Sequence, residues 1–144
     1  VAAALRDAAV RTGTPLAQLL ATVDIESDFH PTADNGIAYG LGQQLPVYSG
    51  YFSDRCWDDT ARRPRCSGPD SRAHNLTGTQ LKTDVEQAAR IAARNIGHLI
   101  RQYGVREGAG RYFAGSNHDV PAAVRYSDAY ERALALWTDR LRRG

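Results

Sequence analysis

The stretch PLAQLLATVDIESDFHP, residues 15–31, places a glutamate at the end of a strongly apolar run. Four residues of this run recur at the spacing of one helical face: Leu16, Leu19, Leu20 and Val23. Thr14 and Pro15 have the pattern of an N-cap followed by proline at the first helical position. Glu26 lies three residues after Val23 and therefore extends the same face. The stretch predicts a helix that buries this face and carries a carboxyl group in its last turn.

The position of Glu26 predicts an unusual acid. Burial and the negative end of the helix dipole both disfavour the anion, so we expect its pKa to rise from ~4.3 towards 6. A carboxyl group that stays protonated near neutral pH is suited to general acid catalysis. The alternative is that the helix ends before Glu26 and the side chain turns into water. Position alone leaves both interpretations open.

Helical signals dominate the rest of the chain, and strand signals are poor. A short first helix is expected over residues 3–10, ended by Gly13. A long helix is expected from Thr83, which has capping-box spacing with Glu86, to the stop at Gly104. One apolar stripe follows this long helix: Val85, Ala88, Ala89, Ala92, Ile96, Leu99, Ile100 and Tyr103.

The remaining segments complete an all-α prediction. Residues 108–114 predict a short helix, Asp119 and Pro121 begin another, and the last helix is expected from about Ser127. Residues 30–79 are rich in Gly, Pro and Asn and are expected to form ordered loops. We expect a single domain over residues 1–144, with helices around a central one and a long loop region before it.

Length and composition fit one globular domain. A chain of 144 residues can bury roughly 68–70% of its unfolded surface. The net charge of +2 argues against nucleic-acid binding, and no apolar run approaches the ~20 residues of a membrane span. The chain opens on Val1 without a signal peptide, which we interpret as a mature form or an excised domain.

Two cysteines, Cys56 and Cys66, flank a polar segment rich in Arg, Asp and Pro. If bridged, this surface loop would gain roughly 2.5–3 kcal/mol in the loop-entropy model. Their spacing is not CxxC and no histidine lies between them, which argues against zinc. A disulfide predicts an oxidising compartment, and two free thiols in a cytosolic protein are the alternative.

The residues that follow Glu26 add a longer pattern. It contains Glu26-Ser27, Phe29, Pro31, Ala33, Gly40-Leu41-Gly42-Gln43 and Pro46. Two later segments accompany it: Arg111-Tyr112-Phe113-Ala114-Gly115 and Ser127-Asp128-Ala129-Tyr130. Together they resemble the catalytic core of the lytic transglycosylases, of the soluble type, in the lysozyme-like superfamily. The resemblance covers nearly the whole chain, with the cysteine region as the clearest insertion.

The resemblance implies a lysozyme-like fold and cleavage of peptidoglycan. The β-1,4 bond between N-acetylmuramic acid and N-acetylglucosamine would be broken with Glu26 as acid and then base, leaving a 1,6-anhydro end. No metal or other cofactor is implied, and the partners would be peptidoglycan glycan strands. We expect a monomeric domain, alone or within a larger protein or assembly. Its expected location is the periplasm, the cell exterior or a virion.

The resemblance also assigns substrate-binding residues. Ser27 would contact the acid or an acetamido group, and Gln43 the sugar or the Glu26 carboxylate. Tyr112 and Phe113 would offer ring faces to sugars, and Tyr130 would orient Glu26 through its hydroxyl group. For most of them a purely structural role is the alternative.

Two departures from the family pattern stand out. Gly42 occupies a position where methionine is common, which we expect to remove a side chain from the groove wall. Phe113 stands where asparagine is common, which removes an amide near the acid.

Other functions stay open. Ordinary glycosidases use two carboxylates, and a groove-facing Asp34 or Asp54 would favour a lysozyme-type hydrolase, although both are expected to be turn residues. A non-catalytic glycan-binding or assembly module is a third possibility. The four histidines, His30, His74, His98 and His118, show no ligand spacing.

Overall fold

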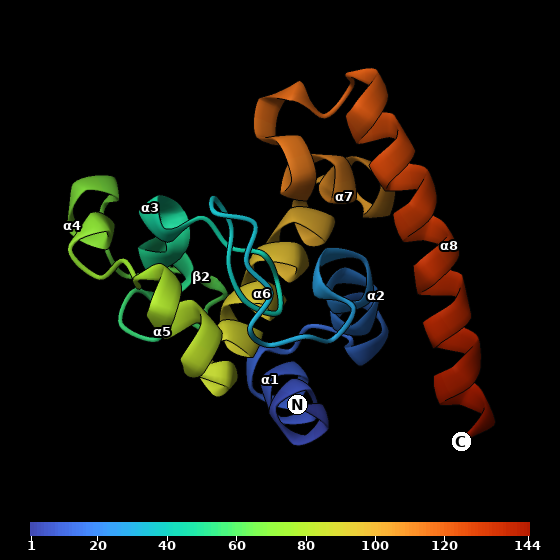
Figure 1. Cartoon of the computed structure of the whole chain (residues 1–144), viewed down its shortest axis with the longest axis horizontal. Helices are drawn as coiled ribbons and strands as arrows, with labels where there is room; N and C mark the ends of the chain where they lie inside the picture. The colour runs from blue at the N-terminus through green and yellow to red at the C-terminus, as the bar shows by residue number, and fades with distance from the viewer.

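The computed structural model describes residues 1–144, and helix α6 (Val85–Tyr103) runs through its middle. α6 packs against helices on several sides, among them α1, α2, α5 and α7 (Figure 1). Small residues such as Ala89, Ala92, Ala93 and Gly97 let these neighbours approach closely. The apolar stripe of the sequence therefore became the central helix that was expected.

The chain is mostly helical, with one small hairpin. Its elements are α1 (Ala2–Thr12), α2 (Leu16–Ser27), α3 (Pro46–Ser49), η1 (Gly50–Phe52), β1 (Trp57–Asp58), β2 (Arg63–Pro64), α4 (Gly68–Arg72), α5 (Gly78–Thr83), α6, α7 (Val105–Ala114), η2 (Gly115–Asn117) and α8 (Pro121–Arg143). The two strands pair antiparallel, Trp57 opposite Pro64. None of the helices combines the length and the hydrophobicity that a membrane span requires.

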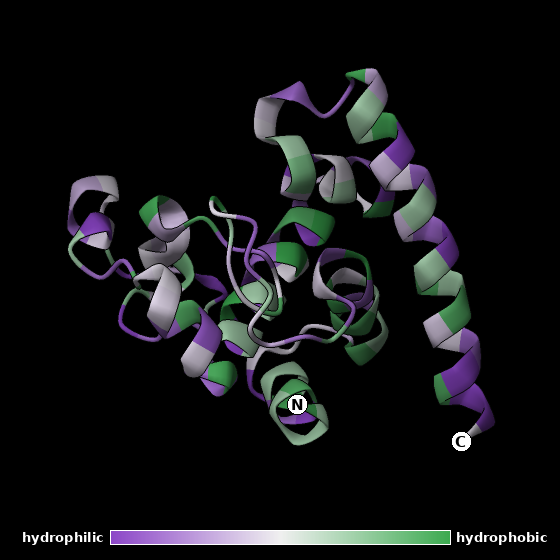
Figure 2. Cartoon of the chain, in the orientation of Figure 1, coloured by the Kyte–Doolittle hydropathy of each residue, from purple (hydrophilic) through white to green (hydrophobic).

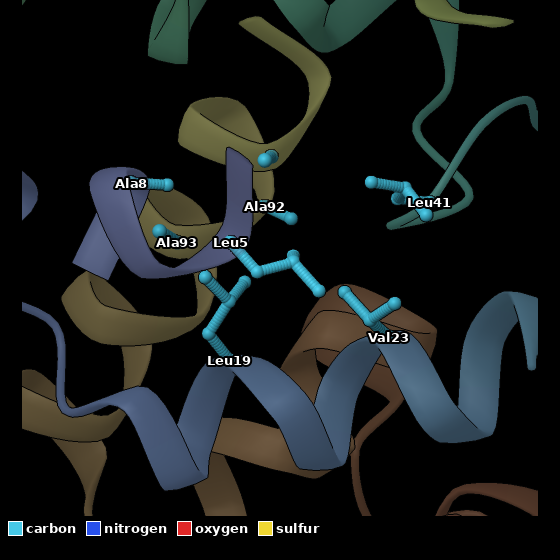
Figure 3. Packing of buried hydrophobic residues seen from close by; sticks show 8 residues of the cluster. Leu5, Ala8, Leu19, Val23, Leu41, Ala92 and Ala93 are labelled. Carbon is cyan, nitrogen blue, oxygen red and sulfur yellow. The ribbon is translucent and has the colours of Figure 1, made fainter. Parts of the chain in front are cut away.

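The largest core cluster joins α1, α2, α6 and the loop after α2. Figure 3 shows Leu5, Leu19 and Val23 converging on Ala92, with Leu41 entering from the loop. A second cluster joins α2, α6, α7 and α8 around Ala21, Ile96, Ala109, Tyr126 and Tyr130. Helix α2 belongs to both clusters, so its position is fixed from two sides.

Helix α2 continues through Glu26, as the first interpretation of the sequence required. It ends at Ser27, and Asp28 forms a left-handed C-cap with φ 49°. Its predicted N-cap was wrong, because Pro15 takes that position. The Thr14 hydroxyl instead donates to the Ala93 carbonyl at 2.6 Å, which ties the α1–α2 turn to the central helix.

Three other helix boundaries differ from the prediction. Asp84, not Thr83, caps α6 by accepting from the backbone of Gln87, and the capping box lies at Thr77 and Gln80, before α5. Helix α7 begins at Val105, three residues before the predicted start. The two last predicted helices are one, α8, because Val120 and Pro121 provide a start that nothing downstream interrupts.

The loop region of residues 30–79 contains short helices and the hairpin. Cys56 and Cys66 form the expected disulfide, with Cα atoms 5.1 Å apart. Arg94 of α6 anchors the same region, since its fully buried side chain bonds to Asp59 at 2.9 Å and to Asp54 at 2.7 Å. The cysteine loop is therefore closed by its own disulfide and attached to the central helix by ion pairs.

Candidate active site

Glu26 lies at the edge of a hollow formed by α2, the following loop and α7. The cavity measures about 290 Å³ and is lined by Glu26, Asn35, Ala38, Gln43, Leu45, Tyr112 and Phe113. A second hollow of about 540 Å³ shares Gln43, Leu45, Tyr112 and Phe113 with it and extends to Tyr48 and Ser116. The shared lining makes the two hollows one groove, with the acid at one end.

Burial raises the pKa of the Glu26 carboxyl from 4.5 to about 7, against the opposing effect of a hydrogen bond from Tyr126. That phenol donates to Glu26 Oε2 at 3.0 Å. At neutral pH the group is therefore divided between its acid and base forms. A carboxyl in this state can both give and take a proton in one reaction cycle.

Tyr130 does not orient the acid, contrary to the prediction. It is fully buried, and its hydroxyl donates to the Gln18 carbonyl at 2.8 Å beside Thr22. Tyr126, one turn earlier on α8, makes the hydrogen bond to Glu26 instead. Both tyrosines lie on one helical face, so the sequence indicated the face but not the residue.

The Tyr126 ring also supports the groove wall. It stacks on Phe113 with ring centroids 4.9 Å apart, and Phe113 is 50% exposed. Burial, and then the neighbouring Glu26, raise the pKa of Tyr126 well above its usual value, so its hydroxyl keeps its proton. Phe113 thus presents one face to the groove and is held by Tyr126 on the other.

Tyr112 is a wall residue fixed at its hydroxyl. It donates to the Gly42 carbonyl at 2.7 Å and accepts from Gln44 Nε2 at 2.6 Å. The expected gap at Gly42 is absent, because a Cβ there would lie 2.7 Å from that of Ala92 and 2.8 Å from the Tyr112 hydroxyl. The phenol and the Gln44 amide fill the space that a methionine would need.

Gln43 and Ser27, which were also predicted to bind substrate, form hydrogen bonds within the protein. The Gln43 amide donates to the carbonyls of Ala33 and Gly40 at 3.2 and 3.0 Å, which closes the loop, while the residue lines both hollows. The buried Ser27 hydroxyl donates back to the Val23 carbonyl at 3.1 Å. Gln43 is thus placed in the groove, and Ser27 is occupied within α2.

The aspartates near the site are engaged elsewhere. Asp34 pairs with Lys82 at 2.7 Å and accepts from the backbone of Gly36. Burial works against the Asp54 anion, but hydrogen bonds and charge from Arg90 and Arg94 lower its pKa to about 2. Asp24 accepts from the Trp137 indole at 3.0 Å. Glu26 is the single carboxyl group that lines either hollow.

Two other features of the molecule lack the chemistry of a catalytic site. The hollow of about 490 Å³ between α1, α2 and α8 is lined by apolar residues and Arg6, without a carboxyl group. Cys56, Cys66 and His74 lie together, but the two sulfur atoms are bonded to each other and offer no thiolate to a metal.

Comparison of the chain with known proteins found no matching family model, no similar curated protein and no similar solved structure.

Proposed function

We propose that the chain is a lysozyme-like lytic transglycosylase domain that cleaves peptidoglycan glycan strands. The observation that carries the proposal is the single carboxyl group of the groove, Glu26, whose pKa is raised to about 7 by burial. The motif of Glu26-Ser27 and residues 40–43 supports the same assignment, because Glu26 and Gln43, one from each of its segments, line the same hollow.

The proposed reaction uses one protein group twice. The Glu26 carboxyl gives its proton to the glycosidic oxygen, and the bond from that oxygen to the anomeric carbon breaks. The carbonyl oxygen of the substrate's own N-acetyl group bonds to the anomeric carbon and holds its developing charge. The Glu26 carboxylate then takes the proton of the muramic 6-hydroxyl, whose oxygen displaces the acetamido oxygen and closes the 1,6-anhydro ring. No water is consumed.

Three side chains support these steps in the proposal. Tyr126 donates to the carboxylate form of Glu26, which stabilises the charge left after the first proton transfer. Phe113 and Tyr112 offer ring surface along the groove, and sugars bind readily to such faces. The groove is thus polar at its acid and aromatic along its wall, which suits an N-acetylated glycan.

A lysozyme-type hydrolase is the second candidate. It shares the acid, but a water nucleophile is ordinarily activated by a second carboxylate across the bond. Asp34 and Asp54 are paired with Lys82, Arg90 and Arg94, outside the groove. This arrangement favours the substrate's own hydroxyl as nucleophile. The disulfide favours a periplasmic, secreted or virion location over the cytosol.

The products distinguish the two reactions. Purified peptidoglycan is digested in heavy-oxygen water, and the released muropeptides are examined by mass spectrometry. The proposal expects anhydro ends that are lighter by one water and carry no heavy oxygen. Reducing ends labelled with heavy oxygen would establish the hydrolase instead. Glu26→Gln is the matched control, and full lysis by this variant would contradict both reactions.

A further inference from the structure

The groove at Glu26 does not end at Tyr48. Tyr48 of α3 lines the hollow of about 540 Å³ and also a further hollow of about 300 Å³. This third hollow is formed by Val47, Tyr48, Tyr51, Gly68, Ser71 and Arg72. Three hollows therefore follow one another from Glu26 towards α3 and α4, which lie at one end of the molecule (Figure 1).

The third hollow is rigidly built. The Asn75 side chain accepts from the backbone of Gly50 at 2.8 Å and donates to the Val47 carbonyl at 3.1 Å, joining the segment after α4 to α3 and η1. A Cβ at Gly50 would overlap the Ser71 carbonyl, so the two walls are in direct contact. Backbone walls fixed in this way lose little freedom when a ligand binds.

Its side chains combine aromatic surface with a free cation. Tyr48 is 70% exposed, and Tyr51 is held edge-on by Phe52 with ring centroids 4.9 Å apart. Arg72 is exposed and belongs to none of the ion pairs of the molecule, whereas Arg65, Arg90 and Arg94 are each paired with an aspartate. An unpaired arginine that lines the same hollow as an exposed tyrosine matches a ligand that carries both a sugar and an acidic group.

We propose that this hollow is a remote subsite for a carboxylate-bearing unit of the glycan strand. The inference rests on the proposed function, because the strand is the polymer whose bond lies at Glu26. Tyr48 stacks on a sugar ring, and Arg72 pairs with a carboxylate attached to the strand. The subsite thus gives the enzyme a preference for substituted strands over neutral polymers of N-acetylglucosamine.

The carboxylate has two sources in a cell wall. A strand without peptides exposes the lactyl carboxylate of muramic acid, and a strand with peptides exposes the carboxylates of the peptide. Neutral oligomers of N-acetylglucosamine have neither group and serve as the uncharged reference. These three ligands separate binding of the sugar from binding of the acid.

The test measures dissociation constants by titration calorimetry in a Glu26→Gln background, where the ligands stay intact. Arg72→Ala is expected to weaken one or both carboxylate ligands about two- to fivefold, an effect that salt reduces, and to leave neutral oligomers unchanged. Tyr48→Ala is expected to weaken all three, and Tyr48→Phe to restore them. Arg142→Ala removes the same charge at the far end of α8 and is expected to change nothing.

Each result decides one proposal. A loss confined to peptide-bearing strands assigns the carboxylate to the peptide, and a loss confined to bare strands assigns it to the lactyl group; both support the subsite. Equal binding of every ligand by Arg72→Ala and its parent overturns the subsite while the function stands. If the unmodified chain cleaves no strand and the Glu26→Gln form binds none, the proposed function itself fails.

Discussion

Tyr126 and Glu26 are 100 residues apart in sequence, yet the tyrosine hydroxyl donates to Oε2 of the glutamate at 3.0 Å. The same ring stacks on Phe113, so one side chain of α8 contacts both the acid and the groove wall. The hydrogen bond lowers the pKa of Glu26, while burial raises it by more. The protonation of the acid therefore depends on the balance between α8 and the surrounding apolar groups.

Tyr126→Phe removes the hydroxyl and keeps the ring. Because the lost hydrogen bond favours the carboxylate, the pKa of Glu26 is expected to rise above about 7. The alkaline limb of the pH–rate profile for strand cleavage should move to higher pH, and kcat should fall because the carboxylate loses its donor. Carboxyl carbon NMR of Glu26 measures the same shift without substrate.

Tyr130→Phe is the matched control, because it removes the other buried hydroxyl of the same helical face. Its bond to the Gln18 carbonyl contributes about 1 kcal/mol to folding. The variant is expected to lose stability without moving the pH–rate profile. An unchanged profile in Tyr126→Phe together with a moved one in Tyr130→Phe would reverse the two roles.

Glu26→Gln tests whether the acid is held neutral by the fold. The pKa of Glu26 is about 7 in the folded state and 4.5 in the unfolded state. The protonated carboxyl therefore contributes its full share to folding stability below pH 4.5, and this contribution is lost as pH rises through 7. Glutamine cannot ionise. At pH 8 the variant should therefore exceed the parent in stability by roughly 3–3.5 kcal/mol, since the two pKa values differ by about 2.5 and each pKa unit corresponds to about 1.4 kcal/mol.

The measurement is urea unfolding of both proteins at pH 4, 6 and 8. The difference in free energy of unfolding should be close to zero at pH 4 and grow with pH. A difference that is the same at all three values would mean that Glu26 ionises normally. In that case the groove would lack the poised acid on which the proposed function depends.

The sequence predicted the central helix and the position of Glu26 because apolar periodicity is a local signal. Helix α6 carries this signal over its full length, and in α2 it reaches from Leu16 to Val23 and leads on to Glu26. In α8, apolar and polar residues alternate along the helix, as the hydropathy colouring shows (Figure 2). These patterns do not depend on what the helix packs against, so they can be read before the fold is known.

The choice between Tyr126 and Tyr130 could not be made in the same way. The two residues share a face, and only the crossing of α8 over α2 decides which of them meets Glu26 and which meets Gln18. The surroundings of Gly42 could not be predicted from the sequence either. Its environment is supplied by Ala92, Tyr112 and Gln44, and the Ala92 and Tyr112 contacts come from helices distant in sequence.

Arg94→Ala tests the attachment of the cysteine loop to α6. Arg94 is buried between Asp54 and Asp59, so its removal leaves two partly buried carboxylates short of a partner. Breaking a buried ion pair on one side costs about 3–5 kcal/mol. Arg11→Ala removes a more exposed partner of Asp59, 3.4 Å away, and should cost less than about 1 kcal/mol.

The same variant has a pH signature. The pKa of Asp54 is lowered to about 2, so its pairing stabilises the fold above pH 3.8 and is lost as pH falls through 2. In thermal unfolding, the Tm of Arg94→Ala should lie far below that of the parent at pH 7, and the difference should narrow below pH 3. Equal losses in Arg94→Ala and Arg11→Ala would show that burial of the pair contributes little.

Gly42→Ala tests whether the wall beside Glu26 has room for a side chain at position 42. The added Cβ would lie 2.7 Å from the Ala92 Cβ, 2.8 Å from the Tyr112 hydroxyl and 2.9 Å from Gln44 Nε2. The alanine of α6 cannot rotate away, so the loop or Tyr112 has to move. Overpacking of this kind costs about 1–3 kcal/mol, and the Tyr112 bond to the Gly42 carbonyl should weaken with it.

Gly68→Ala is the matched control, because no atom lies within 4 Å of a Cβ at that position. It begins α4, where alanine replaces a residue of poor helix propensity, so stability should stay equal or rise slightly. Chemical unfolding is measured on both variants, and strand cleavage on Gly42→Ala and its parent, because Gly68 lines the third hollow. If Gly42→Ala matched its parent in both measurements, Tyr112 would be free to move, and the fixed aromatic wall beside Glu26 would have to be abandoned.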